Sequence, residues 1–233
     1  MGVKISVNLL CSKNNLMALS VKAWYFIAVE FNNIALPQTF SETEKLYEQG
    51  YEIAQWSGAV NFLFLDESIV LIKRSDSMPS HSGQIGFFGG HKKTDEQEPI
   101  QVAMREFEEE SGLSRDLVVY EGILQPVMTA RQQIIFPVLG RLQLSEQEFF
   151  TRVVSNGEWD NMILLSAASI QREELWSYGR MQNYPIYFFP LLPEFSRYWR
   201  SDNQNPYTLW GATAKMIWNF FKNVEASDKF SLR

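Results

Sequence analysis

Several features are scarce in this chain of 233 residues, and cysteine comes first, with a single copy at Cys11. One cysteine cannot form an intramolecular disulfide, so the chain is not a disulfide-stabilised scaffold and suits a reducing compartment. Low-complexity tracts are missing too, and a short glutamate-rich segment is the only block of like charge, which argues against extensive disorder. We therefore expect a folded, cytoplasmic protein.

Apolar runs long enough to cross a bilayer are also lacking. Residues 16–29 are rich in apolar side chains, but Lys22 interrupts them, and the stretch is shorter than the roughly 20 residues that a spanning helix needs. Lysine and arginine total 21 against 27 acidic residues, the net charge is −6, and no basic stripe is visible. We expect neither a membrane nor a nucleic-acid partner, whereas a small phosphorylated ligand needs only a local group of cations.

Bulky apolar residues, in contrast, are abundant: hydrophobic residues make up 45% of the chain and aromatic residues 14%. This is ample material for one large core. Short β-rich runs combined with a few helical segments predict an α/β sandwich. We expect residues 51–233 to form the main domain and residues 1–50 an N-terminal extension that packs on its core. The expected strands are 59–65, 68–73, 84–88, 117–124, 133–136 and 161–165, and the expected helices are 41–48, a segment from Pro99, and 210–224.

The helix expected from Pro99 has clear local signals at both ends. Proline is well tolerated in a first helical turn, and Gly112 suits the residue that stops a helix. Between them, Ile100, Ala103 and Phe107 form an apolar stripe that would pack against a core. A glycine pair, Gly89-Gly90, ends the strand expected before this helix and adds little steric bulk there.

The same helix carries four glutamates within five positions, and like charges at helical spacing repel one another. Glu106, Glu109 and Glu110 are spaced i, i+3, i+4, so their carboxylates converge on one face, whereas Glu108 turns to the opposite side. A hard divalent cation such as Mg²⁺ or Mn²⁺ prefers oxygen ligands and would relieve the repulsion. The spacing therefore indicates a metal site, and the alternative is an acidic helix that simply faces solvent.

Together, Gly90, Glu96 and the run Arg105–Leu113 resemble the Nudix box, G-x5-E-x7-R-E-U-x-E-E-x-G-U, in which U is a bulky apolar residue. The match from Arg105 to Leu113 is complete, and one extra residue separates Glu96 from Arg105. The resemblance implies a Nudix-type α/β/α sandwich with a mixed β-sheet, and a hydrolase of diphosphates that uses divalent metal. Such metals neutralise the charge that shifts among phosphoryl oxygens and activate water at neutral pH.

The resemblance also implies roles for individual residues. Arg105, Glu106 and Glu109 are the expected catalytic residues, with Arg105 orienting a glutamate through charge-assisted hydrogen bonds. The general base stays open between Glu106, Glu109 and a loop carboxylate such as Glu158. The expected ligands of Mg²⁺ or Mn²⁺ are Glu106, Glu109, Glu110 and the carbonyl of Gly90.

Two further segments resemble the coenzyme A pyrophosphatase branch of the family. The runs 70–75 and 81–90 are similar to the branch's L-L-T-x-R-S-x3-R-x-H-x-G-Q-x-x-F-P-G-G, and 209–214 is similar to its (I/L)-W-G-x-T-A. An extra residue inside the box also occurs in this branch. Three residues depart from the branch pattern: Pro79 stands where arginine is usual, Phe88 where proline is usual, and Lys93 where an acidic residue is common. These departures bear on the substrate more than on diphosphate hydrolysis.

Four residues near the box are candidates for binding a diphosphate substrate: Lys73, Arg74, His81 and Gln84. For the charged pair the alternative is solubility at a strand edge, and for His81 it is a structural turn. Tyr184, Tyr187, Phe188 and Phe189 would line a pocket or, as the better interpretation, pack in the core, and Trp210 is likewise read as a packing anchor.

The resemblance therefore implies a hydrolase that cleaves coenzyme A or its thioesters to 3′,5′-ADP and (acyl-)phosphopantetheine. A first alternative is a Nudix hydrolase of an NDP-sugar or dinucleotide, with Pro79 and Phe88 reshaping the pocket. A second is a Nudix-like ligand sensor without catalysis, although here every box glutamate is retained. The oligomeric state is not determined, and a homodimer stays open.

Overall fold

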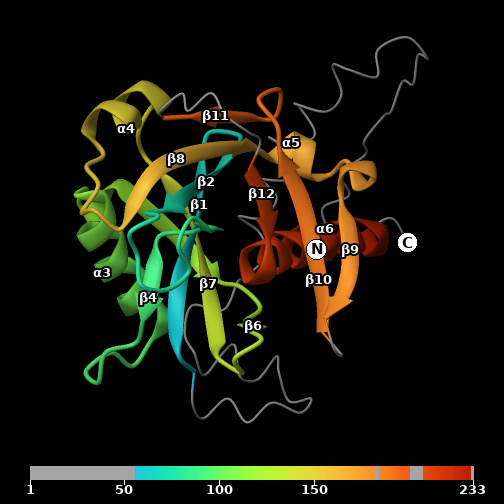
Figure 1. Ribbon diagram of the computed structural model, residues 1–233, viewed down its shortest axis with the longest axis horizontal. Helices are drawn as coiled ribbons and strands as arrows, with labels where there is room; N and C mark the ends of the chain where they lie inside the picture. Colours follow the sequence, from blue (N-terminus) through green and yellow to red (C-terminus); the bar gives the residue numbers. More distant parts are fainter. Residues whose placement is uncertain (1–55, 182–183, 200–206, 232–233) are drawn as a thin grey trace, which may run out of the picture. The chain divides into compact units, whose positions relative to one another are not determined.

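The computed structural model describes residues 56–181, 184–199 and 207–231 of the chain. The expectations for Cys11, for the apolar stretch 16–29, for the helix 41–48 and for the extension 1–50 lie outside these residues. Within the described part, strands gather in two sheets, and helices flank the larger one (Figure 1).

The larger sheet contains both parallel and antiparallel pairs. Its main path runs β11-β8-β2-β1-β7-β5, with β3 added to β2, β4 to β1 and β6 to β7. β1 and β7 are parallel, whereas β1–β2, β2–β8 and β5–β7 are antiparallel, so the sheet is mixed, as predicted. Its strands are β1 (Gly58–Leu65), β2 (Ser68–Arg74), β3 (Ile85–Gly86), β4 (Gly89–His91), β5 (Val118–Ile123), β6 (Val127–Met128), β7 (Ile134–Leu142), β8 (Trp159–Ser166) and β11 (Ser196–Tyr198).

The smaller sheet and the helices complete the described fold. The smaller sheet has the order β12-β10-β9, formed by β9 (Ser177–Met181), β10 (Tyr184–Leu191) and β12 (Tyr207–Trp210). The α-helices are α3 (Pro99–Ser111), α4 (Glu146–Arg152), α5 (Ala167–Ile170) and α6 (Gly211–Ser231). Two short 3₁₀ turns, η3 (Arg115–Leu117) and η4 (Glu173–Leu175), lie between them.

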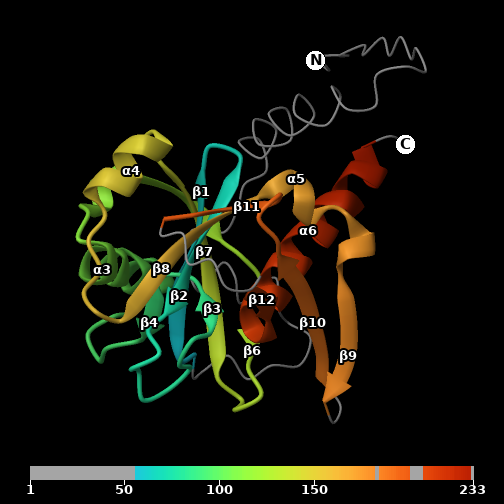
Figure 2. The same cartoon turned by 45° about the horizontal axis from the view of Figure 1, so that its top comes forward.

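Strand β1 shows why the architecture is a sandwich, because its alternate side chains enter two different cores. Leu63 and Leu65 pack in the cluster that contains Phe107 of α3. Phe62 and Phe64 point the other way, and their rings lie 4.9 and 5.9 Å from the ring of Phe220 on α6. Helices α3 and α6 therefore cover opposite faces of the sheet, which confirms the predicted α/β/α arrangement; Figure 2 shows the sheet between them.

Most strands of the larger sheet lie where the sequence predicts them, but the ends of some strands differ from the predicted ones. The hairpin at Asp66-Glu67 is confirmed. The strand expected at 84–88 is shorter, because only Ile85–Gly86 pair with β2, as β3, and the side chain of Phe88 enters the core. The glycine pair expected to end that strand belongs to a separate strand, β4, which pairs with β1. β7 continues through Pro137 to Leu142, since pairing with β1 on one side and β5 on the other holds it extended.

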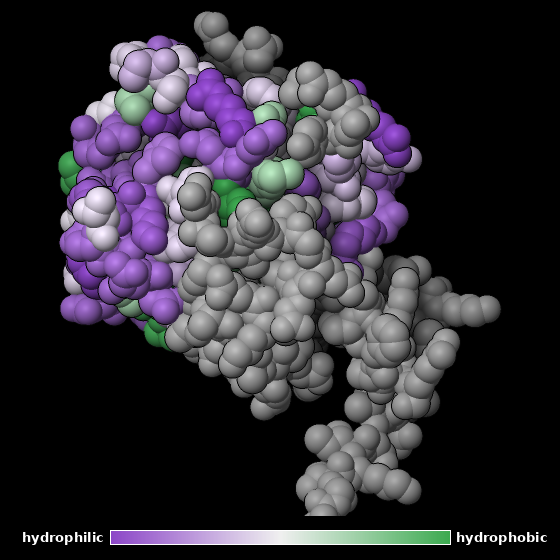
Figure 3. Space-filling model, turned by 90° about the horizontal axis from the view of Figure 1, so that it is seen from below, coloured by the Kyte–Doolittle hydropathy of each residue, from purple (hydrophilic) through white to green (hydrophobic). Residues whose placement is uncertain are grey.

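The C-terminal helix also differs from its predicted bounds. It begins at Gly211, and Trp210 belongs to β12 rather than to the helix. Trp210 is 42% exposed, so its interpretation as a packing anchor was wrong. Phe189 is fully buried, which confirms core packing for this residue of β10, whereas Tyr187 is partly buried and stacks on Trp218. None of the described helices combines the length and apolarity needed to cross a membrane. Described residues on the face shown in Figure 3 are mainly hydrophilic.

Candidate active site on the glutamate helix

Helix α3 is held in place at both ends by the local signals that predict it. Pro99 occupies the first turn, and the backbone N–H groups of Gln97 and Glu98 donate to Oε1 of Gln101 at 2.7 and 2.9 Å. At the other end Gly112 adopts the left-handed conformation, with φ of 68°, and its N–H donates to the carbonyl of Glu108. Phe107 is fully buried, so the apolar side of α3 faces the sheet, whereas the glutamates of the other side range from buried to exposed.

Glu110 is the buried member of the acidic group, with 1% of its surface exposed. Its Oε2 accepts a hydrogen bond of 2.7 Å from the backbone N–H of Gly89. Burial, the main cause, together with repulsion from Glu106 and Glu158, raises the pKa of Glu110 to about 8, against the lowering effect of the Gly89 N–H. Trp159 fixes this end of the helix, because its indole N–H donates to the Glu110 carbonyl at 2.7 Å.

Glu106 lies against the glycine pair. A side chain at Gly90 would overlap the Glu106 carboxylate, so the absence of a Cβ there is what admits the glutamate. Burial is the main reason why the pKa of Glu106 is raised, with added repulsion from Glu109 and Glu158, and the hydrogen bond from Arg105 offsets part of it. Glu106 and Glu110 thus lie in one site, where ionising both carboxyl groups at the same time is unfavourable.

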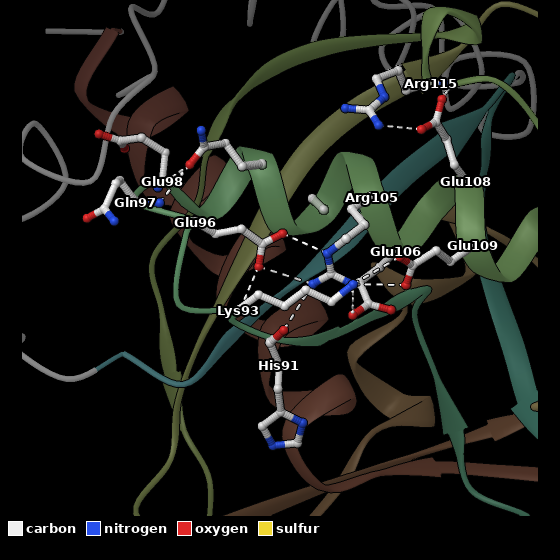
Figure 4. A network of polar contacts seen from close by, with 12 residues as sticks. His91, Lys93, Glu96, Gln97, Glu98, Arg105, Glu106, Glu108, Glu109 and Arg115 are labelled. Carbon is white, nitrogen blue, oxygen red and sulfur yellow. Dashed lines mark hydrogen bonds and ion pairs between the residues drawn. The ribbon is translucent and has the colours of Figure 1, made fainter.

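Arg105, in the middle of α3, connects Glu96 before the helix with Glu106 and Glu109 on the helix (Figure 4). Its Nε donates to Glu96 at 2.7 Å, its Nη1 donates to Glu106 at 2.6 Å and to Glu109 at 3.0 Å, and its Nη2 donates to the His91 carbonyl at 3.0 Å. These bonds raise the pKa of Arg105, led by the bond to Glu96. The guanidinium therefore fixes the orientation of glutamates, which agrees with the role expected from the sequence.

Glu109 and Glu108 lie in different surroundings. Glu109 accepts from Lys93 Nζ at 3.1 Å as well as from Arg105, and these bonds lower the pKa of Glu109 although desolvation opposes them. Glu108 points to the other side of the helix, as predicted, where it pairs with Arg115. Only the three glutamates at i, i+3, i+4 spacing therefore belong to the candidate site.

The donor set of α3 suits a hard divalent cation. Glu106 and Glu110 are carboxylates whose mutual repulsion a cation would relieve, and the Gly89-Gly90 turn lies beside both of them. Among the described residues, however, no three acidic, histidine or cysteine side chains already converge as a finished metal centre. The carboxylates fit Mg²⁺ or Mn²⁺ by their chemistry, and Arg105 now neutralises part of the charge of Glu106, as Lys93 does for Glu109.

The four residues predicted to bind substrate fall into two pairs. Lys73 Nζ lies 3.0 Å from Asp76 and 3.7 Å from Asp160, so two carboxylates compensate its charge. Arg74 lies 3.8 Å from Glu158. The Nε of Arg74 is buried and has no hydrogen-bond partner within the described part of the chain. Both cations are thus paired with carboxylates, and the substrate role of both stays a prediction.

His81 and Gln84 lie on the loop between β2 and β3. His81 Nδ1 and Gln84 Oε1 are 3.0 Å apart, and both side chains are accessible. His81 adopts a φ of 56°, a region that non-glycine residues seldom occupy. The C-terminal segment supports this region, because the hydroxyl of Thr213 in α6 donates to the Ile85 carbonyl at 3.2 Å. Because β2 also pairs with β3, all three sequence segments that resemble the coenzyme A branch are in contact through the segment 81–90.

Asn61 is a positioning residue that sequence reasoning missed. Its Nδ2 donates to the carbonyls of Phe88 and Ala103, at 3.2 and 2.9 Å, and its Oδ1 accepts from the Tyr120 hydroxyl at 2.9 Å. One buried amide thus ties β1 to the glycine turn and to α3. The available signal was a single polar residue within the apolar run 59–65.

Comparison with known proteins agrees with this geometry. Residues 56–165 match the family model of the NUDIX domain, which includes the glycine pair, α3 and all the glutamates described above. This part of the chain is therefore a Nudix domain, and its fold is the α/β/α sandwich with a mixed sheet.

Two curated relatives are similar to parts of this chain. A protein named Nudix hydrolase 15, mitochondrial, from Arabidopsis thaliana is 27% identical over 159 residues, which cover 65% of this chain and 51% of the relative. A protein named uncharacterized Nudix hydrolase NudL, from Yersinia pestis, is 32% identical over 75 residues, covering 32% of this chain and 38% of the relative. The chain thus spans about half or less of the length of these relatives.

Among solved structures, a MutT/nudix family protein from Enterococcus faecalis aligns with 94% of this chain and 76% of its own, at 14% identity and a TM-score of 0.45. A likeness at this level has no bearing on activity.

Proposed function

We propose that this protein is a Mg²⁺- or Mn²⁺-dependent hydrolase of a small-molecule diphosphate. The observation that carries the proposal is the set of Glu106, Glu109 and Glu110 on one side of α3, inside a Nudix domain, with Glu106 and Glu110 against a glycine turn. These three carboxylates, with the Gly90 carbonyl, would hold the metal. When bound, the metal supplies charge neutralisation for the phosphoryl oxygens and lowers the pKa of water.

The reaction adds water across a P–O–P bond. The water oxygen forms a new bond to one phosphorus, the bridging oxygen leaves with the other phosphate, and two phosphate monoesters result. Arg105 keeps Glu106 and Glu109 in a fixed orientation through its hydrogen bonds to both. The proton of the attacking water must pass to a base. Glu106, Glu109 and Glu158 are the candidates.

Glu158 is the candidate for the base that fits the geometry best. Arg105 donates to Glu106 at 2.6 Å and to Glu109 at 3.0 Å, so a cation holds both of these carboxylates more closely than Arg74 holds Glu158. Glu158 stands on the loop before β8, partly exposed, with Arg74 at 3.8 Å, and lies near enough to Glu106 and Glu110 to raise the pKa of each. Glu158→Gln should therefore lower kcat while Mn²⁺ binding is retained, and an unchanged kcat would exclude this role.

For the substrate we propose coenzyme A or its thioesters, cleaved to 3′,5′-ADP and (acyl-)phosphopantetheine. The support is the resemblance of residues 70–75, 81–90 and 209–214 to the coenzyme A branch, together with the contact between Thr213 and Ile85 that joins two of these segments. The alternative is an NDP-sugar or dinucleotide, favoured by Pro79 and Phe88 where the branch has arginine and proline. Phe88, however, is buried against Phe107 and Trp159, so this departure alters the core rather than a substrate surface.

A substrate panel tests the assignment. Coenzyme A, acetyl-coenzyme A, ADP-ribose and UDP-glucose are incubated with the full-length protein and Mg²⁺, and the products are separated by chromatography. Preferential release of 3′,5′-ADP from the coenzyme A compounds supports the proposed substrate, whereas preference for ADP-ribose or UDP-glucose supports the alternative. Binding without turnover of any compound would indicate the non-catalytic sensor instead.

A further inference from the structure

Lys93 lies at the edge of the candidate metal site and is bonded to two of its acidic residues. Its backbone N–H donates to Glu96 Oε2 at 2.6 Å, and its Nζ donates to Glu109 Oε1 at 3.1 Å. The other oxygen of Glu109 accepts from Arg105 at 3.0 Å. Both carboxylate oxygens of Glu109 are therefore bound by protein cations (Figure 4).

The two cations on Glu109 differ in how firmly they are held. Arg105 is anchored by further bonds to Glu96, Glu106 and the His91 carbonyl, and only 16% of its side chain is exposed. The side chains of Lys93 and Glu109 are 55% and 48% exposed, respectively. An exposed lysine–glutamate pair is weak and is screened by salt, and the lysine stem is flexible. Lys93 can therefore leave Glu109 while Arg105 stays.

We propose that Lys93 competes with the divalent cation for Glu109 and thereby sets the metal affinity of the site. The proposal rests on the metal-dependent function proposed above. The ammonium occupies one oxygen of a carboxylate expected to bind metal, and its positive charge repels an incoming cation.

Equilibrium binding of Mn²⁺ to the full-length protein, measured by electron paramagnetic resonance of the free ion, tests this role without requiring turnover. Lys93→Met removes the charge and keeps most of the apolar stem, and Lys93→Arg keeps the charge. Lys92→Met is the matched control, because the neighbouring Lys92 lies 4.6 Å from the ring of Trp56. We expect Lys93→Met to bind Mn²⁺ about threefold to tenfold more tightly than wild type, an effect limited by solvent screening.

The control variants show whether a change in Mn²⁺ binding comes from the charge of Lys93. Lys92→Met and Lys93→Arg should bind Mn²⁺ within about twofold of wild type, on the same screening argument. If Lys93→Met also stays within that range while Glu110→Gln weakens binding, Lys93 has no such role and the metal site stands. If Glu110→Gln binds Mn²⁺ as wild type does, the metal site itself is misplaced and the proposed function fails with it.

Discussion

Replacing Glu110 by glutamine should change how the stability of the metal-free protein depends on pH. Glu110 is buried, and its pKa is raised to about 8 from an ordinary value of 4.5. Between these two values the folded state holds a proton on Glu110 that the unfolded state has released. The stability that Glu110 contributes is therefore fully present below about pH 4.5 and is lost as the pH rises through about 8.

The size of the effect follows from the same shift. One pKa unit corresponds to about 1.4 kcal/mol, so the free energy of unfolding should fall by up to about 5 kcal/mol across this window because of Glu110. Glu110→Gln removes the titration but keeps an oxygen that can accept from the Gly89 N–H. Glu108→Gln is the matched control, since Glu108 lies on the other side of α3 with Arg115.

Urea unfolding in the presence of a chelator, at several values between pH 5 and pH 8.5, measures this difference. Wild type and Glu108→Gln should lose stability relative to Glu110→Gln as the pH rises. Mg²⁺ should remove most of the difference, because a cation stabilises the ionised carboxylate. Parallel curves for wild type and Glu110→Gln would refute the reasoning, since they would show that burial does not hold a proton on Glu110.

Two further substitutions test the residues that hold the glutamates and helix α3 in place. Arg105→Met should lower the free energy of unfolding by about 3–5 kcal/mol in urea, because it leaves Glu96 and Glu106 partly buried without their partner; a loss below about 1 kcal/mol would contradict this. Phe107→Ala should cost about 3–5 kcal/mol in the same assay, since Phe107 is fully buried and its ring meets that of Phe88 edge-on, and a near-neutral result would show that α3 is not anchored there.

The parts of the site that were predictable depend on residues close together in the chain. Helix α3 has a proline start, a glycine stop and an apolar stripe, and its glutamates are related by helical spacing alone. The bond from Arg105 to Glu109 likewise spans one helical turn. Helical spacing alone therefore predicts that Glu106, Glu109 and Glu110 share one face of α3 and that Glu108 lies on the opposite side.

The rest depended on pairing between distant segments. Asp160 neutralises Lys73 only because β2 and β8 are neighbours in the sheet, and the sequence gives no sign of that proximity. The smaller sheet was not predicted either, since its strands are defined by pairing with one another and by packing on α6. The burial of Phe88 also depends on tertiary packing. It shows that the phenylalanine found in place of the branch's usual proline is a core residue and not part of a substrate surface.

The central claim is that the carboxylates of α3 bind a divalent cation that diphosphate hydrolysis requires. The most direct measurement is the rate of diphosphate hydrolysis as Mg²⁺ is added to wild type, Glu109→Gln and Glu108→Gln. We predict that wild type and Glu108→Gln become active with Mg²⁺ and lose activity with chelator, while Glu109→Gln falls by at least about a hundredfold, on the order of losing a charge-stabilising group. Hydrolysis without metal, or near-normal activity of Glu109→Gln, would contradict the account.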